Sequence, residues 1–284
     1  MKRAIARHQT LWLRLFIITV IVTVVMPYSI PLLLDLLISV VPLALAFVRA
    51  PRSKSGPVEL APPVRGRWVA VNSPGTVVPS HGIRAYGQTY AVDLIMPSAE
   101  APAKIGWSPR TRPPESFVSF GVPVLAMAAG RVVRATDSQR DHGSRDTWPS
   151  LIWMTVVEAL IRELAGVDRI LGNHVIVEHE DGTFAAYAHL RHSSLKVSVG
   201  DQVAEGQQLA EVGNTGNTSE PHLHVQLMDS PHLTAAAGIP MLWPAIEPEA
   251  EKDPRWSTGE PKPTAVAGFP ENGRVFEATE VTTG

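Results

Sequence analysis

The chain has 284 residues, of which 45% are hydrophobic and 18% charged, so it is long enough to bury at least one full core. Its formal charge is -2 and it has no long run of Lys or Arg, which excludes the electrostatic footprint of a nucleic-acid-binding protein. Cysteine is absent, which excludes disulfides, thiolate metal sites and a cysteine nucleophile. Any metal site must therefore use histidine and carboxylate side chains.

The N-terminal part is apolar from Leu11 to Phe47, apart from Arg14, Asp35 and a few small polar residues. A membrane-spanning helix needs about 20 such residues, and no clean Ala-x-Ala cleavage site follows a short apolar segment. Met26–Pro31 breaks the stretch in the middle. We therefore expect residues 1–48 to form an uncleaved membrane anchor, either a transmembrane helix or a tight helical hairpin. The alternative is a helix pair buried in a soluble domain.

The rest of the chain divides by composition. Residues 49–63 have the Pro, Ser, Gly and charge content of a linker. A folded domain is expected over residues 64–246, and residues 247–284 form a C-terminal tail rich in Pro and Glu. We expect Pro244–Pro263 to be irregular and Arg274–Phe276 to return as an edge strand.

Short strands separated by turns are expected throughout the folded domain. The predicted strands are Arg67–Val71, Thr89–Ile95, two segments within Val122–Val133, Asn173–His179, Thr183–Leu190 and Leu209–Val212. An Asp-Gly turn joins the fifth and sixth of these segments, which is a strong hairpin signal. The predicted fold is mainly β: an antiparallel β sandwich or partly open barrel with a helical insertion.

The insertion is Asp137–Leu171. Within it, Ser150 is placed to cap a helix that runs from Leu151 to Leu164, with Gly166 just past its end. The first two turns of this helix are apolar nearly all round, which a solvent-facing helix would not be. We expect the insertion to cover the domain, the membrane or a regulatory protein, and to gate access rather than supply chemistry.

Two histidines share one face of a predicted strand. Successive strand side chains point to opposite faces, so His222 and His224 project together while Leu223 points away. Neutral imidazole is the commonest metal ligand, although the motif alone also fits two half-buried histidines that only bond their neighbours. Upstream, Asp93 lies in an apolar strand, where a carboxylate is costly to bury unless it is paired or binds a metal.

Several motifs in order resemble the lysostaphin/LytM-type zinc metalloendopeptidases, which cut bacterial peptidoglycan cross-bridges. They are Tyr187–Leu190 (YAHL), Gly213–Gly216 (GNTG) and Pro221–His224 (PHLH), with Asp93 upstream. The resemblance extends over residues 64–227. It implies Zn²⁺ as cofactor, a peptidoglycan peptide as substrate, and a cell-membrane protein whose catalytic domain is extracytoplasmic.

By this resemblance, His224 and Asp93 are zinc ligands, and His189 and His222 are the two unligated catalytic histidines. The resemblance leaves one position open, because the family pattern places its first ligand where this chain has Thr89. We assign the nearest upstream histidine, His81, as that ligand. Other histidines are expected to be structural or to lie in the insertion: His174, His179, His192, His232 and His142.

The residue types support this chemistry independently. Two histidines, one carboxylate and a water form an open tetrahedral zinc site, in which zinc lowers the pKa of the water and polarises the scissile carbonyl. His189 and His222 would then orient the water and stabilise the oxyanion. Three alternatives remain: a non-haem iron oxygenase, which uses a similar ligand set; a catalytically degenerate module that activates another cell-wall hydrolase; and a structural membrane protein without a site.

Overall fold

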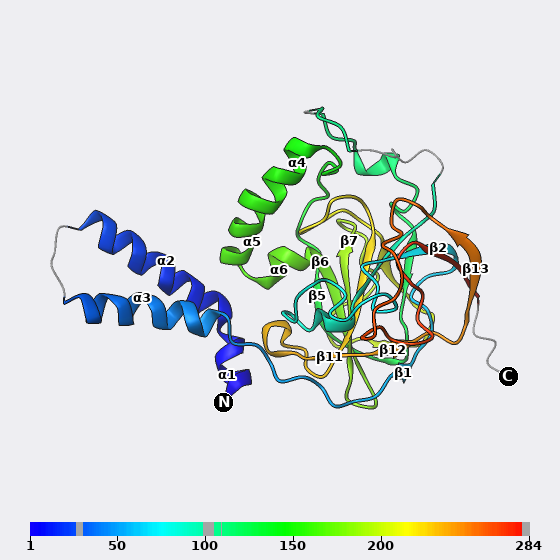
Figure 1. Cartoon of the computed structure of the whole chain (residues 1–284). Coiled ribbons are helices and arrows are strands. Elements are labelled where there is room, and N and C mark those ends of the chain that lie inside the picture. Colours follow the sequence, from blue (N-terminus) through cyan, green and yellow to red (C-terminus); the bar gives the residue numbers. More distant parts are fainter. Residues whose placement is uncertain (27–30, 99–104, 109, 280–284) are drawn as a thin grey trace.

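The computed structural model describes residues 1–26, 31–98, 105–108 and 110–279 (Figure 1). Its strands are β1 (Val58–Glu59), β2 (Gly66–Val71), β3 (Val92–Ile95), β4 (Pro123–Leu125), β5 (Gly130–Thr136), β6 (Asn173–His179), β7 (Phe184–Leu190), β8 (Gln202–Val203), β9 (Gln208–Glu211), β10 (Leu223–Met228), β11 (Gly238–Ile239), β12 (Met241–Leu242), β13 (Ile246–Lys252) and β14 (Arg274–Ala278).

One long antiparallel sheet has the strand order β13-β14-β2-β3-β10-β7-β6-β5-β8, with β11 paired to β10. A smaller antiparallel pair, β4–β9, contributes side chains to the same core, and β1 pairs with β12 in parallel. The prediction of a mainly β, antiparallel fold is therefore confirmed. The predicted strand at Thr89–Ile95 begins only at β3, because Gln88–Tyr90 forms a 3-10 turn, η1, after Gly87, whose φ of 75° is left-handed.

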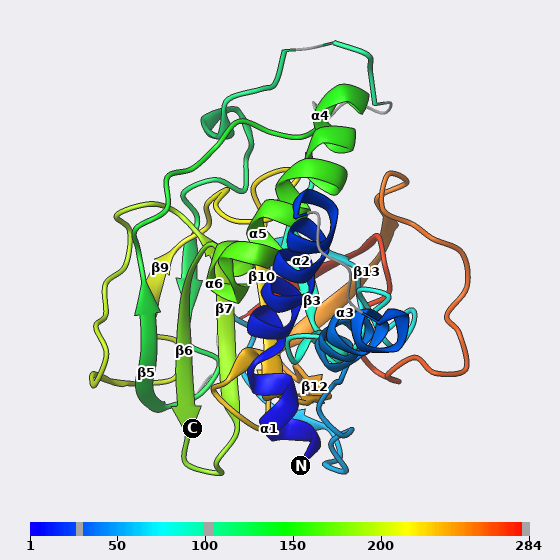
Figure 2. The same cartoon turned by 90° about the vertical axis from the view of Figure 1, so that its left-hand side faces the viewer.

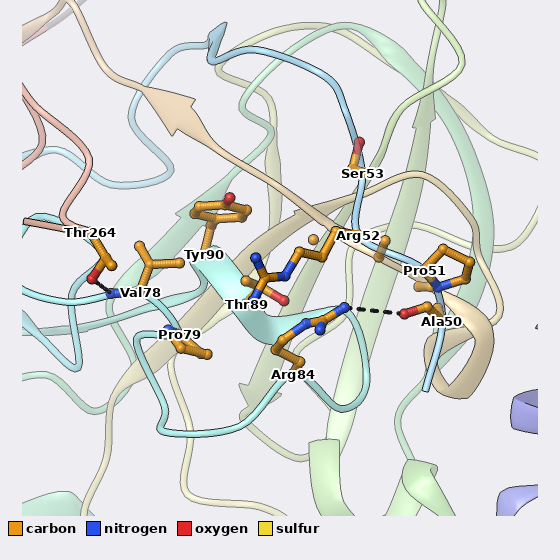
Figure 3. A pocket seen from close by; sticks show the side chains of 13 residues that line it. Ala50, Pro51, Arg52, Ser53, Val78, Pro79, Arg84, Thr89, Tyr90 and Thr264 are labelled. Carbon is orange, nitrogen blue, oxygen red and sulfur yellow. Dashed lines mark hydrogen bonds between the residues drawn. The ribbon is translucent and has the colours of Figure 1, made fainter. Parts of the chain in front are cut away.

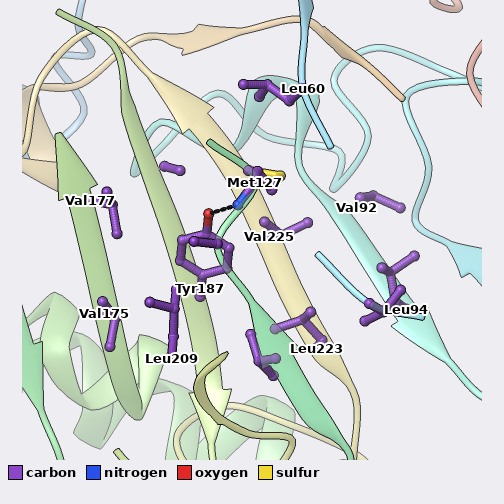
Figure 4. Close-up of a cluster of buried hydrophobic side chains, with 14 of the residues drawn as sticks. Leu60, Val92, Leu94, Met127, Val175, Val177, Tyr187, Leu209, Leu223 and Val225 are labelled. Carbon is purple, nitrogen blue, oxygen red and sulfur yellow. Dashed lines mark hydrogen bonds between the residues drawn. The ribbon is translucent and has the colours of Figure 1, made fainter. Parts of the chain in front are cut away.

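The core lies on one face of this sheet (Figure 4). Alternate residues of β10, Leu223 and Val225, are fully buried there beside Val92 and Leu94 of β3. Tyr187 of β7 reaches across the same core, and its hydroxyl accepts a hydrogen bond from the Met127 amide at 2.7 Å. Because strand side chains alternate, the residues between these point to the opposite face, where His224 and Asp93 lie.

Helices of the insertion cover that opposite face. The helices of the chain are α1 (Lys2–Arg7), α2 (Gln9–Val25), α3 (Leu32–Ala46), α4 (Trp148–Trp153), a π-helical turn (Met154–Glu158), α5 (Ala159–Ala165) and α6 (Val167–Leu171). Figure 2 shows α5 and α6 running over β6, β7 and β10, with α2 beside them. The short 3-10 turns are η2 (Pro114–Ser116) and η4 (Leu233–Ala235).

The helical insertion is present, but its start differs from the prediction. Thr147, not Ser150, is the N-cap of α4, and the two residues form a capping box in which the Ser150 hydroxyl accepts from the Thr147 amide at 3.2 Å. Ser150 therefore serves as the third residue of the helix. The helix ends at Gly166, as the sequence predicts.

The α2–α3 hairpin projects away from the sheet (Figure 1). Its helices pack side by side, and the Thr23 hydroxyl donates to Asp35 at 3.3 Å. Many of its apolar side chains are exposed, including Val24 at 80% and Leu33 at 71%. Among residues with a described placement, no helix has both the length and the apolar character needed to cross a membrane, so the predicted span is not confirmed. The predicted break at Met26–Pro31 includes residues 27–30, which lie outside those described.

Two predictions about the C-terminal region are wrong: that Pro244–Pro263 is irregular, and that the strand at Arg274–Phe276 lies at an edge of the sheet. The part of Pro244–Pro263 that forms β13 is a strand, and β14 pairs with both β13 and β2, so Arg274–Phe276 is inside the sheet and not at its edge. Val275 and Phe276 of β14 are fully buried, whereas most of β13 is exposed, so β13 is held as a strand by its pairing with β14 and not by burial of its own side chains. Within the predicted linker, β1 forms a strand and Leu60 packs in the core.

Candidate active site

Asp93 and His224 face each other because of strand register. The antiparallel pairing of β3 and β10 sets these residues directly opposite, on the face that points away from the core. His224 Nδ1 lies 2.9 Å from Asp93 Oδ1, and both residues are buried. Cross-strand neighbours on one face are close by construction, so the pair is fixed by backbone geometry.

His81 reaches the same carboxylate from the loop before η1. Its Nε2 lies 3.2 Å from Asp93 Oδ2, and the donor atoms of His81, Asp93 and His224 all lie within 4.8 Å of one another. The loop is tied back to η1, since the Ser80 amide donates to Thr89 O at 3.1 Å. His81, which the sequence analysis assigned because the family's usual ligand position holds Thr89 here, is thus brought into the site by a loop rather than by a strand.

Neighbouring groups orient the three side chains. Gln226 Oε1 lies 2.9 Å from His224 Nε2 and can only accept there, which leaves His224 Nδ1 unprotonated when the ring is neutral. Ser80 Oγ lies 3.1 Å from His81 Nδ1 and supports Nε2 as the free nitrogen of that ring. Asn72 donates to Asp93 Oδ2 at 2.7 Å. These contacts present two imidazole lone pairs and a carboxylate to one point.

His189 and His222 form the other half of the site. Their ring centroids are 4.8 Å apart, and His189 is 5.7 Å from the ring of His224. Each donates its Nδ1 proton to a backbone carbonyl: His189 to Thr215 O at 2.9 Å and His222 to Glu220 O at 2.8 Å. In the neutral rings, the Nε2 atoms therefore carry lone pairs and can accept a proton.

His189 has a left-handed backbone, with φ of 62°. Ala185 and Tyr187 belong to the main core, whereas Ala186 and Ala188 face the helices, so strict alternation would turn His189 into the core. The left-handed residue interrupts the alternation: His189 joins the site, and the next residue, Leu190, packs in the core. Such a backbone costs about 1–3 kcal/mol and is concentrated at functional sites.

Burial and the shared charge set the protonation of the site. Burial lowers the pKa of His222 and lowers that of His189 well below its ordinary value, so both rings are neutral at pH 7. Burial alone would raise the pKa of Asp93, but the charges and hydrogen bonds of His81, His222 and His224 hold it well below its usual range. Burial opposes the charge of His224 as well, yet its bond to Asp93 raises its pKa.

These side chains line a cavity of about 420 Å³. Its floor contains His81, Asp93, His189, His222 and His224. Its opposite wall comes from the insertion, through Met154, Ala159, Arg162 and Glu163. The insertion therefore forms a wall of the cavity that holds the histidine cluster, and the volume of this cavity is in the range of small-ligand sites.

Polar contacts hold the insertion helix over the cavity. Glu158 accepts from Arg145 at 2.6 Å and pairs with Arg162 at 3.2 Å. Glu163 accepts from Tyr86 and, at 2.8 Å, from Gln9 at the start of α2. Further along α2, Arg14 donates to Leu164 O at 2.7 Å and caps the end of α5. The N-terminal hairpin and the cavity wall are therefore mechanically connected.

The first part of the insertion supports the site itself. Asp141 accepts from the Asn214 amide at 2.6 Å, and His142 Nε2 lies 3.0 Å from Gly216 O. These contacts hold the turn whose Thr215 carbonyl binds His189. The expectation that the insertion takes no part in the site is therefore wrong for Asp141 and His142, which hold this turn. That the helix of the insertion gates access stays a prediction.

All five histidine and carboxylate residues singled out in the sequence converge on this cavity. Of the histidines set aside as structural, His174 and His179 are buried in β6, His192 and His232 lie outside the cavity lining, and His142 supports the turn. The sequence analysis missed Gln226, Asn72 and Ser80. Gln226 carried a usable signal, because it shares the parity of His222 and His224 on a strand that otherwise alternates with apolar residues.

Comparison with known proteins gives one family match. Residues 154–235 match the family described as peptidase family M23, a segment that contains His189, His222 and His224 but neither His81 nor Asp93. The cell division protein DipM of Caulobacter vibrioides is 48% identical over 60 residues, which is 21% of this chain and 10% of DipM. The peptidoglycan DD-endopeptidase ShyA of Vibrio cholerae is 38% identical over 72 residues, 25% of this chain and 16% of ShyA.

Among solved structures, the catalytic domain of lysostaphin from Staphylococcus simulans has a TM-score of 0.32 and 22% identity, covering 61% of this chain and 88% of that domain. The chain matches only a small share of the curated relatives' own length, 10% of DipM and 16% of ShyA. The ordered YAHL, GNTG and PHLH motifs all lie inside the matched segment, so this part of the chain is similar to the lysostaphin/LytM-type peptidases of family M23.

Proposed function

We propose that the chain is a membrane-anchored zinc metalloendopeptidase that hydrolyses peptide bonds in bacterial peptidoglycan cross-links. The observation that carries this proposal is the meeting of His81, Asp93 and His224 at one point, beside two further histidines whose Nδ1 atoms are bonded to backbone carbonyls. The match of residues 154–235 to peptidase family M23 supports the peptidase activity, and the name of ShyA supports peptidoglycan as the substrate class.

The donor set fits zinc. Ligand atoms about 2.0–2.2 Å from a tetrahedral zinc ion lie about 3.3 Å from one another. Asp93 Oδ1 is 2.9 Å from His224 Nδ1, Asp93 Oδ2 is 3.2 Å from His81 Nε2, and the donor atoms of the three residues lie within 4.8 Å of one another, so the donors would draw together around the ion. When bound, zinc supplies Lewis-acid polarisation of the scissile carbonyl and a water of lowered pKa.

The unligated histidines supply proton transfer. A water in the cavity can lose its proton to Nε2 of His189 or His222, because the Nδ1 protons of both rings are already committed to backbone carbonyls. The resulting imidazolium then donates to the oxyanion or to the leaving amine. Burial keeps both rings neutral beforehand, which is the state that a general base requires.

A degenerate module that only activates another hydrolase would use the same cavity for binding. The complete set of two histidines, one carboxylate and two further histidines favours catalysis, because a binding role alone needs no metal donor set. Metal analysis and hydrolysis of purified peptidoglycan by the full chain decide between them. Stoichiometric zinc with release of new amino termini supports the peptidase; iron or the absence of both metal and hydrolysis contradicts it.

The α2–α3 hairpin is the proposed membrane anchor. It exposes apolar side chains over most of its surface, and such a surface is stabilised by burial in lipid. Both ends of the hairpin lie at the folded domain: Arg3 of α1 donates to Asp229 at 2.9 Å, and α3 ends beside Gln9, which bonds Arg49 at 3.2 Å. The N-terminus and the peptidase domain therefore belong on the same side of the membrane.

Because peptidoglycan lies outside the cytoplasmic membrane, that side is proposed to be extracytoplasmic. A cysteine introduced at the exposed Ser257 of this cysteine-free chain should react with a membrane-impermeant thiol reagent on intact cells. Protection of this cysteine until the cells are lysed would contradict the location. A second cysteine at the N-terminal Lys2 should react in parallel, since the hairpin keeps both sites together.

A further inference from the structure

A second cavity, of about 280 Å³, lies at the base of the hairpin (Figure 3). Its lining comes from the segment after α3 (50–53), from the loop at Val78–Pro79, from η1 through Thr89, and from residues 236–238. None of its lining residues lines the cavity that holds the histidine cluster. The two cavities are separated by η1, because Gln88 faces the histidine cavity and Thr89 faces the second one.

The second cavity is positively charged. Figure 3 shows the Arg52 and Arg84 side chains directed into it from opposite walls, and the lining contains no carboxylate. Arg84 donates to Ala50 O at 3.4 Å, and within the described part of the chain neither arginine forms an ion pair. Arg84 is half-buried and Arg52 is exposed. Several half-buried arginines elsewhere are matched to carboxylates, whereas Arg84 is not: Arg112 with Asp146, Arg145 with Glu158, Arg255 with Asp253, and Arg274 with Glu271.

Hydroxyl groups complete the lining. Ser53, Thr89, Tyr90 and Thr264 belong to the lining. The Ser53 hydroxyl bonds Ser55 at 3.1 Å, and Thr264 Oγ1 accepts from the Val78 amide at 3.2 Å and keeps its own proton to donate. A hydroxyl can donate to an anion, and a guanidinium presents a planar fork of N–H groups that matches two oxygens of a phosphate. Two cations with no counter-charge, facing one concave space with hydroxyl donors, form the donor pattern of an anion site.

We propose that this cavity binds a phosphate-type anion, either free phosphate or the headgroup phosphate of an anionic phospholipid. The placement favours access from lipid, because Ala50 and Arg52 directly follow the apolar hairpin, where a membrane-bound hairpin would hold them at headgroup level. The site goes beyond the proposed peptidase activity, since no group of the histidine cavity takes part.

A bound anion would also stabilise the wall between the two cavities. The Thr89 carbonyl accepts from the Ser80 amide at 3.1 Å, and Ser80 Oγ in turn contacts His81 Nδ1 at 3.1 Å. An anion bound by both Arg52 and Arg84 would link residues 50–53 to the loop before η1. Occupancy of the cavity should therefore raise the midpoint of thermal unfolding.

The first test titrates inorganic phosphate into the full chain in detergent. Arg52→Gln/Arg84→Gln should weaken the pocket binding by at least about tenfold, because charge-assisted hydrogen bonds are lost. The matched control, Arg140→Gln/Arg169→Gln, removes two exposed arginines elsewhere and should bind like the parent. Phosphate that binds the metal would persist in both variants. An equal affinity in parent and pocket variant overturns the proposal.

The second test separates the two sources of phosphate. The full chain is bound to phosphatidylcholine vesicles with and without phosphatidylglycerol. If a lipid headgroup is the ligand, phosphatidylglycerol strengthens binding of the parent, and Arg52→Gln/Arg84→Gln loses most of that gain. Lys2→Gln/Lys54→Gln, which removes two exposed charges near the hairpin, should lose much less. If Arg52→Gln/Arg84→Gln weakens phosphate binding but leaves the gain from phosphatidylglycerol unchanged, the ligand is free phosphate. If both double variants lose vesicle binding equally and phosphate binding is unchanged, the site is overturned. Arg52→Gln alone, at an exposed side chain, guards against misfolding of the double variant.

Discussion

The floor and the roof of the histidine cavity are built in different ways. The floor uses strands of the central sheet, where Asp93 and His224 are opposed by register and His189 and His222 are fixed by backbone carbonyls. The roof is the inserted helix, which keeps exposed apolar side chains and is held by a few long side chains from other elements. A rigid floor positions reacting groups, and a separately anchored roof can change without disturbing them.

His81 falls between these two modes. It belongs to the floor by its contact with Asp93, yet it is carried by a loop and is supported through Ser80 rather than by strand pairing. The comparison therefore predicts three levels of sensitivity: the metal donors above all, then the unligated histidines and their supports, and last the roof.

The largest effect is expected at the proposed metal donors. His224→Ala or Asp93→Ala removes one of three donors and leaves the cavity with too few to hold zinc. Zinc content, measured on the purified protein by atomic emission, should collapse together with hydrolysis. His81→Ala should behave in the same way. If His81→Ala retains its zinc while His174→Ala or His179→Ala loses it, the loop histidine is not a ligand.

The unligated histidines should show activity loss without metal loss. His189→Ala and His222→Ala each remove a proton acceptor, which costs about 10²-fold or more in rate. Zinc should stay near one ion per chain, because neither ring belongs to the donor group. If these variants also lost zinc, His189 and His222 would be metal ligands, and the floor would not divide into metal donors and unligated histidines.

A smaller effect is expected at Gln226, which orients His224 from the side away from the metal donors. Gln226→Ala removes the acceptor for Nε2 and should weaken zinc affinity about 10–100-fold, as measured by competition with a chelator. Gln226→Glu keeps an acceptor oxygen for Nε2 but loses the amide that donates to Tyr86 O at 2.7 Å, so it separates the two contacts of this side chain. If both variants bind zinc like the parent, ring orientation comes from packing alone.

The sequence predicted the floor better than its surroundings, for physical reasons. Strand parity places His222 and His224 on one face without knowledge of the fold, and a buried Asp93 demands a partner. By contrast, the left-handed backbone of His189 and the loop path of His81 depend on contacts with Thr215 and Ser80 that no local pattern encodes. The strand at β14 was predicted, but β13 was missed for the same reason, since its long-range pairing with β14 cannot be read from a Pro- and Glu-rich composition.

The roof should tolerate replacement if only its helix is removed. Substituting a short Gly/Ser loop for residues 148–165 keeps Asp141 and His142, which hold the turn beside His189. We expect zinc to remain bound and hydrolysis of peptidoglycan to be unchanged or raised. Asp141→Ala is the informative counterpart: it leaves the helix in place but should lower activity through the Asn214 turn. Loss of zinc in the loop variant would show that the roof belongs to the metal site.

The smallest expected effect lies outside the cavity. His174 of β6 is fully buried, and this burial lowers its pKa from the ordinary value of 6.5, although Gly172 O and Asp168 oppose the shift. The unfolded chain therefore binds more protons than the folded chain below about pH 6.5, and the free energy of unfolding should fall as the pH drops.

His174 Nδ1 lies 2.8 Å from Gly172 O. His174→Asn keeps a side-chain donor for this carbonyl, but asparagine cannot take up a proton when the chain unfolds. Urea unfolding of the variant at about pH 7.5 and about pH 5.5 should therefore show a smaller difference than in the parent, by up to about 1.4 kcal/mol per pH unit. Zinc binding and hydrolysis should be retained at neutral pH. If the pH dependence of the free energy of unfolding is the same in the variant and the parent, His174 titrates alike in the folded and unfolded chain. If the variant loses zinc, residues that support the metal site extend beyond β3, β7 and β10.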